Sequence, residues 1–283
     1  MTSDTPPAGD GYDRLLADLA AEQGAVDALV LPAALDRPTI AVGWTVGATV
    51  AHLHASDRAA LVAVTDPPAF DALRARLAHR DRGGHGDEPV GGELLEAWRT
   101  TRAALQDALG ALAGRDRVAW FGPPMSARSF ATARLMEYWA HGEDVALAVG
   151  DPLPATRRLR HVAHLGVLTR RFSFVVRGEE PPAASVLVDL EAPDGTRWTW
   201  GPPDATEVVR GPARHFCLVV TQRRHLADTA LEVVGPGAGA WLRVAQAFAG
   251  AATVTAPERR GLPTSPPGPP TPAAPPRPGR RRR

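Results

Sequence analysis

The sequence predicts an α+β protein in which a four-helix bundle precedes a small domain of mixed strands and helices. Apolar residues recur at helical spacing through the first half, chain breakers cluster at Gly150–Pro154, and apolar residues alternate after that point. The 283 residues are enough for two domains of ordinary size. We therefore expect a bundle over residues 11–150 and an α+β domain over residues 151–250. Residues 1–10 and the Pro- and Arg-rich residues 251–283 are expected to be disordered.

Four apolar stripes predict the helices of the bundle. Each has the spacing of an amphipathic helix that buries one face. In chain order they contain Leu15, Leu19, Val26 and Leu29; Val46, Val50, Leu53, Ala60, Leu61 and Val64; Leu94, Leu95, Trp98, Leu105, Leu109 and Leu112; and Phe130, Ala133, Glu137, His141, Asp144 and Ala148. The fourth stripe differs from the others because polar side chains lie on its buried face.

The second half changes to strand signals. A helix over about 156–176 leads to the alternating residues Val186, Val188 and Leu190, and Asp194-Gly195 is a hairpin signal before a returning strand. The remaining predicted elements are strands at 197–200, 207–210 and 231–234, a helix that Gly211-Pro212 opens, and a closing helix over 241–248.

Glu137 and His141 have the spacing of two metal ligands. Residues four apart lie on one face of a helix, so a carboxylate and an imidazole can close on one ion. The same spacing is also common in ordinary surface pairs. His52 on the second predicted helix can supply a third ligand, since bundles build metal sites from facing helices. The alternative for His52 is a histidine packed on an apolar face.

Small residues surround His52 on its own face and leave space for an ion, namely Ala48, Ala55, Ser56 and Ala59. His54 points away from that face and is excluded as a ligand. His79 and His85 lie in a Gly-rich stretch that we expect to be a solvated loop. A site with three ligands from His and Glu keeps a fourth position open for water or substrate.

Two segments carry a resemblance to a known family. Gly43-Trp-Thr-Val to Val50-Ala-His-Leu53 and Glu137-x-x-x-His141-Gly-x-Asp144-Val resemble the DinB-like superfamily, in particular its mycothiol-dependent maleylpyruvate isomerase branch. The resemblance runs from about Leu15 to Phe248. It implies a divalent ion on His52, Glu137 and His141, mycothiol as a cofactor, and a sterol-carrier-like second domain. The stretch Trp120–Ser126 is similar to an actinobacterial subfamily known mainly as metal-binding, and we expect it to line the pocket.

The resemblance also implies a catalytic arginine. In that family an arginine of the second domain reaches toward the metal site, and the matching residue here is Arg223. A guanidinium there suits an anionic substrate, although a solvated helix end is the alternative. Asp144 is expected to accept the second N–H of His141, to cap the helix or to meet solvent. Arg134 is expected to be a helix-surface or substrate-facing arginine.

The single cysteine, Cys217, lies in an apolar run and is expected to be buried. A reacting thiol must then come from another molecule. The predicted function is a metal-binding, mycothiol-dependent isomerase or thiol transferase that acts on a small electrophilic substrate, with a carboxylate-bearing one as an option. Zinc is the first choice of ion, with nickel, iron and manganese open. The alternatives are a non-catalytic metal-dependent small-ligand-binding protein and a metal-assisted hydrolase.

Composition excludes other classes. The chain has 32 basic and 31 acidic residues, and every basic residue is arginine. Without the tail arginines the body is mildly acidic, which argues against a nucleic-acid-binding protein. No apolar run is long enough for a membrane span and no secretory signal is seen, so a cytoplasmic protein is expected.

Overall fold

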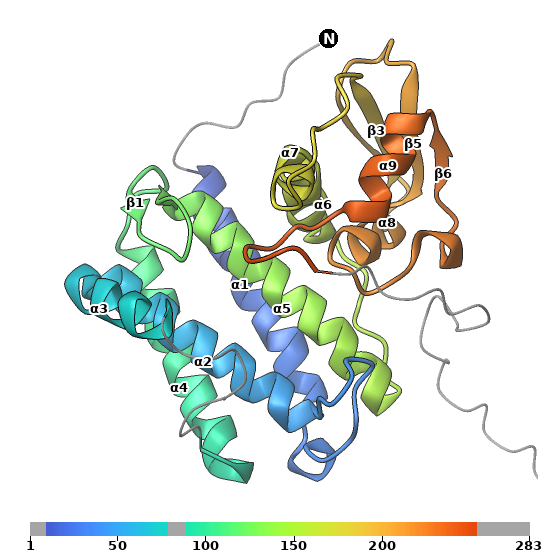
Figure 1. Ribbon diagram of the computed structural model, residues 1–283. Coiled ribbons are helices and arrows are strands. Elements are labelled where there is room, and N and C mark those ends of the chain that lie inside the picture. The colour runs from blue at the N-terminus through green and yellow to red at the C-terminus, as the bar shows by residue number, and fades with distance from the viewer. Residues whose placement is uncertain (1–9, 79–88, 254–283) are drawn as a thin grey trace, which may run out of the picture.

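A computed structural model describes residues 10–78 and 89–253. A helical region comes first and a smaller region containing a sheet follows (Figure 1), so the predicted α+β class is confirmed. The predicted tails and the stretch with His79 and His85 lie almost wholly outside the described residues. Within the described residues, no helix is long and apolar enough to cross a membrane. The exact domain boundaries stay a prediction.

The helical region contains the four predicted helices. They are α1 (Asp10–Leu29), α2 (Val46–Thr65), α4 (Gly91–Gly110) and α5 (Ala127–Val149). Helix α1 packs along α5 and α2 packs along α4, while α5 also contacts α2 and the first helix of the sheet region. Helix α5 is therefore covered on several sides, which explains why polar residues such as Arg134 and Asp144 are buried on it.

A fifth helix, α3 (Pro67–Ala78), was not predicted. It begins with two prolines, and among its side chains with described burial only Phe70 lies fully in the core, so no long apolar stripe marks it. The region also contains a short 3-10 helix at Pro32–Ala34 and the antiparallel pair β1 (Arg117–Val118) and β2 (Met125–Ser126).

Capping residues fix the ends of the two helices that carry the predicted ligands. The Thr45 hydroxyl accepts a hydrogen bond from the Ala48 amide at 3.1 Å and begins α2. The Ser126 hydroxyl accepts one from the Ser129 amide at 3.1 Å and begins α5. Gly150 ends α5 with a φ of 77°, a left-handed conformation that favours glycine. Such caps hold the register of both helices and so the height of each ligand.

The sheet region has four strands in the order β4-β3-β5-β6. They are β3 (Val186–Glu191), β4 (Arg197–Trp200), β5 (Glu207–Pro212) and β6 (Glu232–Val234), with β3 and β5 parallel and the other pairs antiparallel. The predicted hairpin between β3 and β4 is confirmed. The helices of this region are α6 (Leu159–Leu168), α7 (Arg170–Val175), α8 (Ala213–Val220) and α9 (Pro236–Val244), with a 3-10 turn at Leu226–Asp228.

Two predicted helices of this region differ from the structure. The helix expected over 156–176 is broken at Thr169, whose hydroxyl bonds the carbonyls of Leu165 and Gly166 and competes with the helical ladder. The closing helix begins earlier than predicted, at Pro236, where proline fits the first turn. It ends at Val244, because Ala245 has an extended ψ of 133°.

Candidate metal centre

Three of the predicted ligands converge between α2 and α5. His52, Glu137 and His141 each offer one ligand atom, and these atoms all lie within 4.8 Å of one another. Glu137 Oε2 is 3.5 Å from His141 Nε2 and 4.0 Å from His52 Nε2. We call these three residues the open cluster, because the His52 side chain is 38% exposed.

The open cluster fits a divalent ion. Bonds of 2.0–2.1 Å in a tetrahedral site place neighbouring ligand atoms about 3.3 Å apart. The Glu137–His141 separation of 3.5 Å is close to this value, whereas the other separations, 4.0 Å for Glu137–His52 and at most 4.8 Å in the cluster, must shorten when an ion binds. Two neutral imidazoles and a carboxylate are a ligand set that zinc and several other transition metals accept.

The electrostatics of the open cluster favour a bound cation. Burial raises the pKa of Glu137, but hydrogen bonds with His141 and His52 and the charge of Arg134 outweigh it and hold that pKa well below its usual value. Burial lowers the pKa of His52. Burial also lowers the pKa of His141, yet its bonds with Asp144 and Glu137 leave it raised. A proton on His141 therefore occupies part of the place that a metal ion would take.

Asp144 and Arg223 complete the surroundings of His141. Asp144 Oδ2 is 3.3 Å from His141 Nδ1, and the Asp144 side chain is only 5% exposed, so the solvent alternative is wrong. Arg223 Nη2 lies 3.1 Å from Asp144 Oδ2 and 3.3 Å from His141 Nδ1. A carboxylate that accepts the Nδ1 proton leaves the Nε2 lone pair directed at Glu137. The structure thus brings Arg223 from the sheet region to the open cluster, and the solvated alternative for this residue does not hold.

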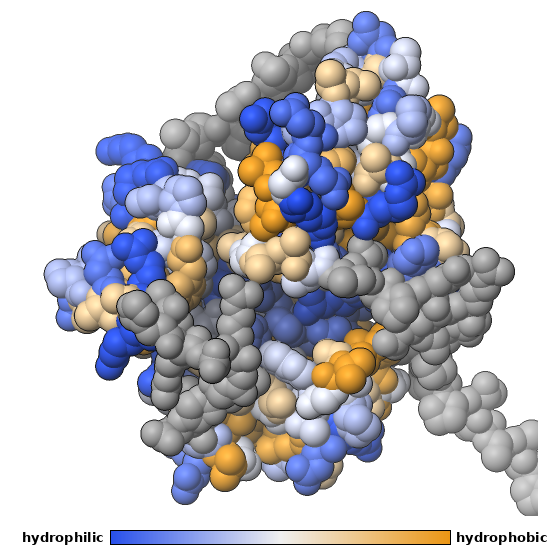
Figure 2. All heavy atoms as spheres, viewed as in Figure 1, coloured by the Kyte–Doolittle hydropathy of each residue, from blue (hydrophilic) through white to orange (hydrophobic). Residues whose placement is uncertain are grey.

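Trp44 is a member of the site that sequence reasoning did not assign. Its ring stacks on His141 with an interplanar angle of 9° and meets His52 edge-on, with centroids 6.0 Å and 5.3 Å apart. The residue lies in the quoted Gly43-Trp-Thr-Val motif, which was the available signal. Figure 2 shows hydrophilic side chains gathered in a hollow between the two regions, over α5.

A second polar cluster lies deeper, between α2, α4 and α5. The Tyr138 hydroxyl donates to Asp57 Oδ2 and accepts from Trp98 Nε1 at 2.8 Å, while Arg134 donates to Ser56. We call these five residues the closed cluster. Burial raises the pKa of Asp57 to about 6, against the opposing charge of Arg134 and the Tyr138 hydrogen bond.

Arg134 is 4% exposed, so the helix-surface alternative is wrong. Its guanidinium lies 5.1 Å from the Trp120 ring centroid, and Ser56 covers its end. Trp120 in turn packs on Phe70 and Phe130. The stretch beginning at Trp120, expected to line the pocket, thus meets the closed cluster through Arg134, and its role at a pocket stays a prediction.

Among the described residues, the other histidines and the cysteine lie apart from the open cluster. His54 is 3% exposed and pairs with the Thr101 hydroxyl, in agreement with its exclusion. Cys217 is fully buried, and burial raises the pKa of its thiol well above the usual value. His161, His164, His215 and His225 bond, respectively, Asp18, Trp200 and the amides of Ala230 and Ala227.

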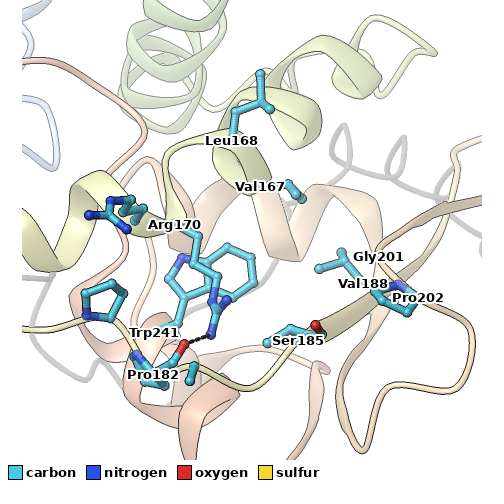
Figure 3. Close-up of a pocket in the computed structure, with 13 residues that line it drawn as sticks. Val167, Leu168, Arg170, Pro182, Ser185, Val188, Gly201, Pro202 and Trp241 are labelled. Carbon is cyan, nitrogen blue, oxygen red and sulfur yellow. Dashed lines mark hydrogen bonds between the residues drawn. The ribbon is translucent and has the colours of Figure 1, made fainter.

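A cavity of 530 Å³ lies in the sheet region (Figure 3). Apolar side chains such as Val167 and Val188 line it, and Arg170 beside it donates to the carbonyl of Pro182. None of its lining residues belongs to the open or the closed cluster. Arg170 and Trp241 also line it, and the buried Nε of Arg170 and Nε1 of Trp241 have no hydrogen-bond partner.

Comparisons with known proteins give two family matches. The model of the mycothiol maleylpyruvate isomerase N-terminal domain matches residues 8–146. The model described as wyosine base formation matches residues 182–233. The second match falls on the sheet region, whose expected likeness to sterol-carrier proteins stays a prediction.

Relatives and solved structures were also found. Two uncharacterized proteins of Mycobacterium tuberculosis, from strains CDC 1551 and H37Rv, are each 49% identical over 244 residues, covering 83% of this chain and 95% of theirs. The crystal structure of the mycothiol-dependent maleylpyruvate isomerase is 19% identical with a TM-score of 0.49, covering 79% of this chain and 92% of that one. A histidine-to-alanine mutant of that enzyme is 20% identical with the same TM-score and coverage.

Proposed function

This chain belongs to the mycothiol maleylpyruvate isomerase N-terminal domain family, and from that premise we propose that it is a divalent-metal enzyme that uses mycothiol. The reaction is an isomerisation or a thiol transfer on a small electrophilic substrate. Zinc is the proposed ion, held by His52, Glu137 and His141. The substrate and the choice between the two reactions stay open within this proposal.

One observation carries the proposal. When both imidazoles are neutral and carry their proton on Nδ1, the three facing atoms of the open cluster are all hydrogen-bond acceptors, and none donates to another. Acceptors that converge in this way repel one another unless a proton or a cation lies between them. A divalent ion satisfies all three at once and leaves about one positive charge at the site, given one carboxylate among the ligands.

The ion, when bound, supplies Lewis acidity that lowers the pKa of a coordinated thiol. Asp144 orients His141 by accepting its Nδ1 proton. Arg223 holds Asp144 in place and adds a positive charge suited to an anionic substrate. Trp44 covers one side of both imidazoles, while the exposed edge of His52 marks the approach for the thiol and the substrate. Cys217 is too deeply buried to be the nucleophile.

The proposal is tested in two steps. First, the purified full-length protein is stripped of metal, reloaded with Zn²⁺ and analysed for ion content, with Glu137→Ala as the loss control. One ion per wild-type chain and none in the variant is the expected result. Second, the loaded protein is screened against small electrophiles with and without mycothiol, and thiol-dependent turnover is expected.

Either step can overturn the proposal. A folded wild type that takes up no divalent ion removes the metal site. Turnover of equal rate without any thiol would assign the open cluster to hydrolysis instead. An ion that binds without turnover of any electrophile would favour a small-ligand-binding protein.

A further inference from the structure

Gln222 has an unusual backbone conformation beside the candidate site. Its φ is 61°, and it is the one residue other than glycine with a positive φ in the described part of the chain. The Gln222 amide bonds the carbonyl of Val219 at 3.0 Å, and the Arg223 amide bonds that of Leu218 at 2.8 Å. This pattern ends α8 as a Schellman motif, in which glycine is the usual residue at the left-handed position. A glutamine there implies that its side chain has a task that glycine cannot perform.

Both polar atoms of the Gln222 side-chain amide make hydrogen bonds. Its Nε2 donates to the carbonyl of Ala245 at 3.0 Å, and its Oε1 accepts from the Thr253 hydroxyl at 2.6 Å. Both partners belong to residues 245–253, which follow α9 and which we call the closing segment. The Ala247 amide also bonds the carbonyl of Val220 at 2.8 Å. The end of α8 and the closing segment are therefore tied together at several points.

These two hydrogen bonds of the Gln222 side chain, which we call the tie, lie directly before Arg223 in the chain. The Arg223 side chain leaves this turn, returns one bond to the Thr221 carbonyl at 2.8 Å and reaches Asp144 at 3.1 Å. The direction in which the Arg223 side chain leaves the turn depends on the backbone dihedral angles of Gln222 as well as on those of Arg223 itself. A left-handed Gln222 held from two sides thus aims Arg223 at the His141–Asp144 pair.

We infer that Gln222 is a positioning residue for the metal centre, acting through Arg223, and that the closing segment is a structural part of that centre. The inference rests on the proposed metal site and on the proposed role of Arg223. It assigns no contact between Gln222 and the ion or the substrate. Its specific claim is that the effect of Gln222 on the site disappears when Arg223 is removed.

The test measures Co²⁺ binding to the full-length metal-free protein through the visible absorption of the bound ion. The variants are Gln222→Gly, Arg223→Ala, their double variant and Thr253→Val. Glycine keeps the left-handed turn but removes the tie, and Thr253→Val removes half of the tie without changing residues 222 and 223. Removing a group that orients a metal ligand lowers the affinity for the metal by about 10- to 100-fold. This loss of Co²⁺ affinity is expected for Arg223→Ala.

Gln222→Gly is expected to raise the Co²⁺ dissociation constant, as Arg223→Ala does. Its thermal unfolding midpoint is expected to stay within a few degrees of wild type. In the Arg223→Ala background, Gln222→Gly should cause no further shift. Thr253→Val should cause a smaller shift of the same sign.

Equal shifts from Gln222→Gly in both backgrounds, or no shift in either, would overturn the inference. An unchanged affinity in Arg223→Ala overturns it as well, because no effect is then left to transmit. Glu137→Ala separates these failures from failure of the metal site: if that variant binds Co²⁺ as tightly as wild type does, the proposed function fails first.

Discussion

The open and the closed cluster share helices α2 and α5, with Trp98 of α4 added in the closed cluster, yet they use polar groups in opposite ways. In the closed cluster, donors face acceptors: Trp98 donates to Tyr138, Tyr138 to Asp57, and Arg134 to Ser56. In the open cluster three acceptor atoms face one another beside an exposed histidine edge. The first arrangement pairs these donors and acceptors internally and leaves Asp57 Oδ1 and Arg134 Nε without a hydrogen-bond partner, whereas the second is complete only when a proton or a cation is added. Helices α2 and α5 therefore contribute both to a buried polar core and to a candidate binding centre.

The largest contrast should come from matched loss of charge in the two clusters. Glu137→Gln keeps the shape of the side chain but removes the ligand charge, so the dissociation constant for Zn²⁺ should rise by more than about 100-fold, beyond the usual effect of changes outside the ligand set. Asp57→Asn should leave one ion per chain. Competition with a chromogenic chelator measures both, and equal losses in the two variants would remove the distinction between the clusters.

Asp57 should make the stability of the protein depend on pH. Its folded-state pKa is raised to about 6, so ionisation is harder in the folded than in the unfolded chain. The wild type should thus lose stability relative to Asp57→Asn as pH rises from about 4 to above 6, by about 3 kcal/mol at most, at 1.36 kcal/mol per pKa unit. Urea unfolding at roughly pH 4.5 and roughly pH 8, on either side of that window, measures the difference in stability between wild type and Asp57→Asn. Parallel pH profiles would contradict the raised pKa.

Asp144→Ala should weaken the open cluster without removing a ligand. The variant takes away the acceptor of the His141 Nδ1 proton and leaves the Arg223 charge unbalanced beside the ion. Both changes disfavour a cation, so Zn²⁺ affinity should fall by about 10- to 100-fold. The chelator assay applies again, with the exposed ion-pair variant Asp71→Ala as the control that should bind normally. A tighter site in Asp144→Ala would refute the proposed orientation of His141.

Tyr138→Phe should affect only the closed cluster and should have the smallest effect. Loss of the hydroxyl leaves Trp98 Nε1 and Asp57 Oδ2 without their partner, which costs about 1–2 kcal/mol of stability for buried groups. Denaturant unfolding at neutral pH measures this cost. Unchanged Zn²⁺ affinity in the same variant is the second expected result, and a large loss of affinity would show that the two clusters are coupled.

The sequence was informative wherever helix periodicity decides the outcome. The heights of His52, Glu137 and His141 follow from spacing within α2 and α5, and capping by Thr45 and Ser126 keeps that spacing in register. Arg134 was assigned to the surface as one alternative, because no sequence rule shows that Ser56 of α2 and Trp120, which lies between β1 and β2, both contact its guanidinium. Tertiary contacts of this kind are set by the packing of distant segments.

Turns and helix breaks were the least predictable features. Thr169 looks helical by pattern, and the break between α6 and α7 coincides with its hydroxyl bonds to two preceding carbonyls. The left-handed Gln222 had no signal, because glutamine is not a usual residue for that conformation. The resemblance pointed to Arg223, but not to the turn that aims it. The predicted cytoplasmic location, the absence of a nucleic-acid partner and the sterol-carrier likeness stay predictions.

The buried Cys217 has a practical consequence for work on this protein. It is the single cysteine of the sequence and is fully covered, and the raised pKa of its thiol suppresses the reactive thiolate. A thiol-reactive dye added to the native protein will therefore report only on thiols supplied in solution, so consumption of a co-substrate can be followed without background. Each chain also exposes this one thiol when its core opens, so the rate of labelling reports the rate of unfolding.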